Sequence, residues 1–156
     1  MLLTIRDAAK VPGRKVVVLF SNGPDTSSML SPADVGRVAE DEGIPVYIIS
    51  TVALNHDRYT PMAFDLLTGE TGGTLYTALS WAKQSDALVS IGKEIGSAYT
   101  LGYYPGPNAN PGFRRVQVRV AGSDGQQYHV RTRAGYEPGS GGIRTEAGFD
   151  PAVTGR

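Results

Sequence analysis

The sequence has no cysteine, and this absence removes several kinds of chemistry at once. Without thiols the chain cannot form a disulfide, supply a thiolate nucleophile or build a zinc site on cysteine ligands. An excess of charge of one sign is missing as well, because 15 basic and 15 acidic side chains cancel in 156 residues. A neutral chain has no overall field that attracts a polyanion, so the composition predicts no nucleic-acid partner.

Long hydrophobic runs are absent too. The longest, Val16 to Phe20 and Pro45 to Ile49, are far shorter than the ~20 residues that a membrane-spanning helix needs, so no membrane span is predicted. Residues 1–10 lack the basic leader and the long apolar block of a signal peptide. Their apolar side chains follow a helical spacing with no N-cap before it, and we expect the last turns of an amphipathic helix in a chain that continues something longer.

What the sequence does contain is a regular alternation of apolar strands and capped helices. Residues 15–20 and 44–51 have the near-continuous apolar pattern of parallel strands that are covered on both faces. Ser31, Pro32 and Asp34 give the capping-box start of a helix. In chain order we predict strand 15–20, helix 32–42, strand 44–51, helix 60–72, strand 74–77 and helix 85–98.

This order predicts an α/β fold, a partial Rossmann-like, doubly wound parallel sheet of three β-α units over residues 1–98. After Ala98 the pattern changes to alternating polar and apolar residues, which predicts an antiparallel β extension over residues 99–136. Within it, residues 113–120 and 128–133 would form a hairpin. The glycine-rich residues 137–156 are expected to be a mostly disordered tail.

Several segments carry a resemblance to a known family. They are GRKVVVLFSNGPDTSS, IPVYIIS, TGETGGTLY, and the tyrosine-rich SAYTLGYYP followed by FRRVQVRV and YHVRTRAGYEP. On these motifs, residues 14–136 resemble the C-terminal half of a von Willebrand factor type A domain, most closely a bacterial subgroup known from acidobacteria. The resemblance implies a non-enzymatic protein-interaction or adhesion-type module that binds a protein partner. It also implies an exported protein, periplasmic or extracellular.

Intact members of this family bind a divalent cation at a metal-ion-dependent adhesion site built from three loops, one of which carries Asp-x-Ser-x-Ser. That motif is absent here, and the Ser-Asp-Gly of a second loop reads Ser21, Asn22, Gly23. The resemblance therefore implies a relic adhesion loop, formed by Ser21, Asn22, Gly23 and Asp25, that holds no metal. We expect no cofactor, with magnesium or calcium bound only if the missing N-terminal half is supplied.

Other interpretations of the same residues stay open. The loop from Ser21 to Ser28 precedes a helix N-terminus, so a flavodoxin-like nucleotide or phosphate binder is an alternative, as is a gene fragment without independent function. His56 and Asp57 have no Gly-x-Ser-x-Gly elbow beside them, and no enzyme is predicted. The acidic run Glu40 to Glu42 is interpreted as a solvated helix end, and Trp81 as a core or staple residue just before the last helix.

Arginines and tyrosines gather in the C-terminal part, a combination that is enriched at protein interfaces. The competing interpretation is an exposed polar face that backs the alternating valines of residues 116–120. An unpaired edge is also expected at strand 15–20, and such an edge favours self-association. The predicted interaction surface consists of Tyr103, Tyr104, Arg115, Arg119, Arg131 and Arg133.

Overall fold

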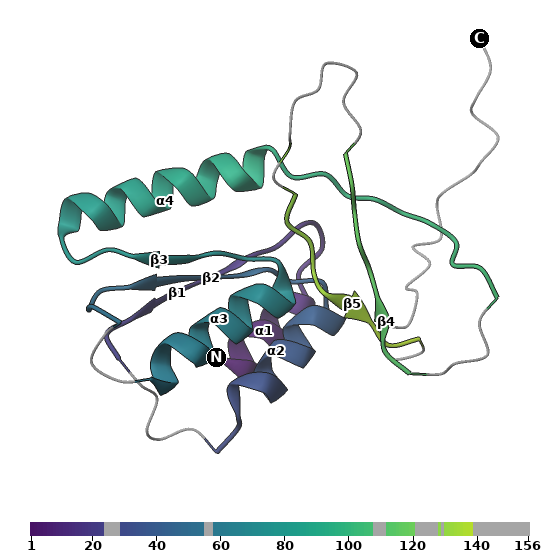
Figure 1. The fold of residues 1–156 in the computed structure, drawn as a ribbon, viewed down its shortest axis with the longest axis horizontal. Helices are drawn as coiled ribbons and strands as arrows, with labels where there is room; N and C mark the ends of the chain where they lie inside the picture. The colour runs from purple at the N-terminus through teal and green to yellow at the C-terminus, as the bar shows by residue number, and fades with distance from the viewer. Residues whose placement is uncertain (24–28, 55–57, 108–111, 121–127, 129, 139–156) are drawn as a thin grey trace, which may run out of the picture.

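The computed structural model describes residues 1–23, 29–54, 58–107, 112–120, 128 and 130–138 (Figure 1). Its centre is a parallel sheet with the strand order β1-β2-β3. The register pairs Leu19 with Ile48 and Ile48 with Leu75. The predicted α/β class is confirmed. The elements are α1 (Leu2–Ala9), β1 (Val17–Ser21), α2 (Pro32–Asp41), β2 (Val46–Ser50), α3 (Tyr59–Thr71), β3 (Leu75–Thr77), α4 (Trp81–Gly96), β4 (Arg114–Arg115) and β5 (Gly135–Tyr136).

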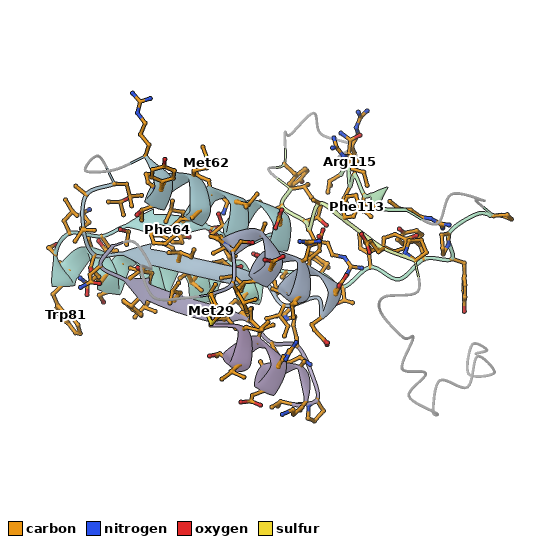
Figure 2. The ribbon with its side chains drawn as sticks, turned by 90° about the horizontal axis from the view of Figure 1, so that it is seen from below. Met29, Met62, Phe64, Trp81, Phe113 and Arg115 are labelled. Carbon is orange, nitrogen blue, oxygen red and sulfur yellow. The ribbon has the colours of Figure 1, made fainter. Side chains whose placement is uncertain are left out.

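Helices cover both faces of the sheet, as expected for a doubly wound arrangement. Helices α1, α2 and α3 lie on one face, and α4 lies alone on the other (Figure 1). Alternation along β2 serves both sides, because Ile48 packs toward α2 and α3 while Ile49 packs toward α4. Phe64 of α3 points into the layer between that helix and the sheet (Figure 2). The three β-α units thus bury two separate apolar layers.

Local sequence signals explain where the helices begin and end. At α2, the Ser31 hydroxyl accepts the Asp34 N–H and the Asp34 carboxylate accepts the Ser31 N–H, which is the predicted capping box. At the end of α3, Gly72 takes a left-handed φ of 80°, a conformation that costs glycine little. The Thr71 hydroxyl then accepts the Val46 N–H at 3.0 Å, which ties the end of α3 to the first residue of β2.

One predicted helix start was wrong. Helix α4 begins at Trp81 rather than at Ser85, because the Ser80 side chain caps it by accepting the Lys83 N–H. Trp81 therefore sits in the first turn, where it is 84% exposed and points away from the body instead of lying in the core (Figure 2). Helix α3 begins at Tyr59, within one residue of the predicted start, and no side chain caps it.

The C-terminal β segment is confirmed as antiparallel, but its pairing differs from the predicted hairpin. Residues 114–115 pair with residues 135–136, whereas the expected partner was 128–133. Residues 130–133 are instead held on the ends of the helices, and the Ala134 carbonyl accepts the Val116 N–H at 3.0 Å at the end of the ladder. Residues 121–127 and 139–156 lie outside the described residues, and so do the predicted hairpin turn and most of the predicted tail.

Candidate functional site

The predicted relic loop begins where β1 ends, at the carboxyl edge of the sheet. The Ser21 hydroxyl donates to the Gly23 carbonyl at 3.0 Å and accepts the Gly23 N–H at 3.4 Å, so this side chain shapes the start of the loop. The Ser21 carbonyl accepts both the N–H and the hydroxyl of Thr51, at 2.8 and 3.2 Å. The loops that follow β1 and β2 are therefore joined at their first residues.

Asn22 is exposed at this edge and presents a neutral amide. Asp25, the fourth residue of the predicted loop, lies outside the described residues, and so does most of the alternative phosphate-binding loop from Ser21 to Ser28. His56 and Asp57 lie outside them as well. Across the described ranges, no three His, Asp or Glu side chains gather in a way that could hold a metal ion. None of the described helices is long and apolar enough to cross a membrane.

The predicted interaction surface divides into two groups. Arg131 and Arg133 are engaged with the α/β body: Arg131 pairs with Glu94 at 3.3 Å and also contacts Thr74, and Arg133 donates to the Glu40 carbonyl at 3.2 Å. The other four residues, Tyr103, Tyr104, Arg115 and Arg119, present exposed side chains.

Residues 130–136, here called the strap, connect the β4–β5 ladder to the helices. The Gly135 N–H donates to the Glu40 carboxylate at 2.9 Å, and the Ala134 N–H donates to the Glu70 carbonyl at 3.2 Å. Farther along the strap, Arg131 reaches Glu94 of α4. These contacts attach the strap to α2, α3 and α4, so it is a part of the folded body and no separate arm.

Two carboxylates below the strap were missed in the sequence. Glu40, which reads as part of a solvated helix end, is only 5% exposed. Burial raises its pKa, while the Gly135 N–H acts in the opposite direction. Burial raises the pKa of Glu70 as well, and the nearby Glu40 carboxylate adds to the effect. One Glu70 oxygen, Oε2, has no hydrogen-bond partner among the described residues, and a Cβ at Gly36 would collide with it.

A third carboxylate, Glu94 of α4, organises the other end of the strap. It accepts the Tyr76 hydroxyl at 2.6 Å and the Thr74 hydroxyl at 3.0 Å, and it pairs with Arg131. Burial, followed by the hydrogen bond to Glu94, raises the pKa of Tyr76 to about 12. The sequence indicated the contacts of the strap with Glu94 and Glu40 only indirectly. Arg131 and Arg133 alternate along one segment, and each guanidinium needs a carboxylate or carbonyl partner.

Comparison of the chain with protein-family models found no match, and comparisons with curated proteins and with solved structures found none either. The resemblance to a von Willebrand factor type A domain therefore rests on the residues of the chain and on its fold class, and it stays a prediction.

Proposed function

We propose that this chain is a non-enzymatic protein-interaction module related to the C-terminal half of a von Willebrand factor type A domain, with a degenerate adhesion site. The observation that carries the proposal is the place of the Ser21-Asn22-Gly23 turn. It lies at the carboxyl end of β1, where open α/β sheets bind their ligands, and it exposes an amide where the family has a carboxylate.

The chemistry of Asn22 supports loss of the metal. Magnesium and calcium are hard cations that are held by several oxygen ligands, and carboxylates supply most of the attraction. An amide oxygen can coordinate such an ion but brings no charge. Among the described residues of this turn, Ser21 to Gly23, no side chain carries a carboxylate, and the Ser21 hydroxyl is already bonded to Gly23. An intact site draws its oxygen ligands from three loops.

Isothermal titration of the chain with MgCl₂ and MnCl₂ tests this proposal. We expect no binding in the micromolar range for the wild type or for Asn22→Ala. Asn22→Asp restores one carboxylate, and we expect it to remain outside the micromolar range because a single ligand does not form a site. Micromolar binding by the wild-type chain would contradict the proposed loss of the site.

The edge of β1 supports a second element of the proposal, association with another polypeptide. In the described part of the chain β1 pairs with β2 only. The Val17 N–H donates to the Pro45 carbonyl and the Ser21 carbonyl accepts the Thr51 N–H, so alternate residues face β2. Parallel pairing therefore points the backbone groups of Val18 and Phe20 away from the sheet. We propose that a second copy of the chain pairs with this edge.

A further inference from the structure

A groove of about 450 Å³ lies between the β4–β5 ladder and the segment that follows α4. The groove is shallow and open to solvent, as expected for a surface that contacts part of a peptide and does not enclose a small molecule. Its described lining combines aromatic rings, one proline and two guanidinium groups, and no carboxylate is among these described residues. The lining residues are Tyr103, Pro105, Gly106, Phe113, Arg114, Arg115 and Tyr136.

One wall of the groove is held in place by contacts within the chain. The rings of Tyr103 and Tyr136 meet edge to face with their centroids 6.5 Å apart, and the Arg133 guanidinium lies 6.0 Å from the Tyr136 ring centroid. A hydrogen bond between the two tyrosine hydroxyls lowers the pKa of Tyr136 and raises that of Tyr103. Because the strap fixes the neighbouring Gly135 to Glu40, this wall is attached to α2.

The part of the lining formed by Phe113 and Arg115 is accessible. Phe113 is 46% exposed, and Arg115 lies beside it with its side chain directed outward (Figure 2). An aromatic side chain can pack on the Phe113 ring, and a carboxylate can accept two parallel hydrogen bonds from a guanidinium such as that of Arg115. A ring and a carboxylate close together in one ligand would use both features.

From this geometry we propose that the groove binds an acidic peptide segment of a partner protein, with an aromatic side chain flanked by Asp or Glu. The inference rests on the proposed role as a protein-interaction module and assigns that role a surface distant from the relic loop. A single nucleic-acid strand fits less well, because it needs a continuous positive track. Here Arg131 and Arg133 are engaged with the body, and the chain is neutral overall.

Fluorescence anisotropy of an N-terminally labelled EEYEE peptide tests the proposal. We expect saturable binding that weakens at least about tenfold with the peptides QQYQQ and EEAEE, since each removes one of the two matched features. Arg115→Glu in the protein should weaken binding of EEYEE by at least about tenfold, and Arg115→Gln by less. Labelled oligothymidylate is measured in parallel.

Arg6→Glu is the matched control, because it makes the same charge change on an exposed residue of α1 that lies outside the groove and outside the predicted interaction surface. It should change the affinity less than about twofold. Equal losses for Arg115→Glu and Arg6→Glu would mean non-specific attraction by the charge of the protein and would overturn the proposal. Tighter binding of oligothymidylate than of EEYEE would overturn it too. If EEYEE does not bind and the wild-type chain still shows no micromolar binding of Mg²⁺ or Mn²⁺, the groove proposal is overturned while the proposed loss of the metal site stands.

Discussion

At the scale of single residues, the most unusual feature is the pair of acids below the strap. Glu40 and Glu70 carry raised pKa values because burial disfavours the charged form, and one oxygen of Glu70 has no hydrogen-bond partner among the described residues. Burying a carboxylate oxygen that has no partner destabilises a fold, so Glu70 in its charged form is unfavourable here. Burial of Glu40 is partly offset, because its carboxylate accepts the Gly135 N–H and so holds the strap on α2.

Glu70→Gln should therefore raise the free energy of unfolding at pH 7, by up to about 1 kcal/mol, because a neutral amide replaces the unpaired charge. A carboxyl whose folded pKa is raised stabilises the fold fully below its ordinary value of 4.5 and loses this contribution as pH rises through the folded pKa. Urea unfolding between pH 4.5 and pH 7 should show stability falling as pH rises, with a smaller slope in Glu70→Gln.

Asp65→Asn is the control, because Asp65 is exposed on the same helix and should have little effect on the slope. Asp34 acts with the opposite sign, since its hydrogen bond with Ser31 lowers its pKa. Its contribution is lost as pH falls through a folded pKa below 3.8, outside the measured range. A wild-type stability that rises from pH 4.5 to pH 7 would contradict the assignment.

At the scale of elements, the junction between α3 and the sheet depends on two glycines. Gly72 ends α3 in a left-handed conformation, and a Cβ at Gly73 would collide with the Val46 carbonyl. Gly73→Ala should lower the free energy of unfolding by at least about 2 kcal/mol, since backbone cannot move aside as a side chain can. Gly69→Ala is the control: it lies in α3 with open space around it and should stabilise the helix by about 0.5–1 kcal/mol. Urea unfolding of the two variants compares these effects, and similar stabilities would refute the close approach.

The sequence was sufficient for the elements whose signals are local. The Ser31 capping box and the apolar runs of β1 and β2 depend on neighbouring residues, and these elements are where the pattern predicts them. The start of α4 was misplaced because two serines, Ser80 and Ser85, both suit a cap, and only the structure shows which one is used. The burial of Glu40 could not be predicted, because its partner Gly135 is 95 residues away in the sequence.

At the scale of the whole molecule, the open edge of β1 defines a specific dimer. Two copies related by a two-fold axis would pair β1 with β1 antiparallel, with Val18 opposite Phe20 of the second copy and Leu19 opposite its own counterpart. Phe20 is 48% exposed, so this pairing also covers an apolar side chain. The pair at Leu19 is a non-hydrogen-bonded one, in which the two Cα atoms lie about 4.5 Å apart.

That separation is within disulfide reach, and the chain has no cysteine of its own, so Leu19→Cys introduces a single thiol. Under mild oxidation we expect Leu19→Cys to form a disulfide-linked dimer on a non-reducing gel. Asn22→Cys is the control: it is exposed, but in this register its two copies would lie about 20 Å apart along the strands. Equal cross-linking of both variants would indicate random collision.

Light scattering of the wild-type protein is the second test. A monodisperse monomer at high concentration would exclude the dimer, because an edge that pairs with a second copy must do so more completely as concentration rises.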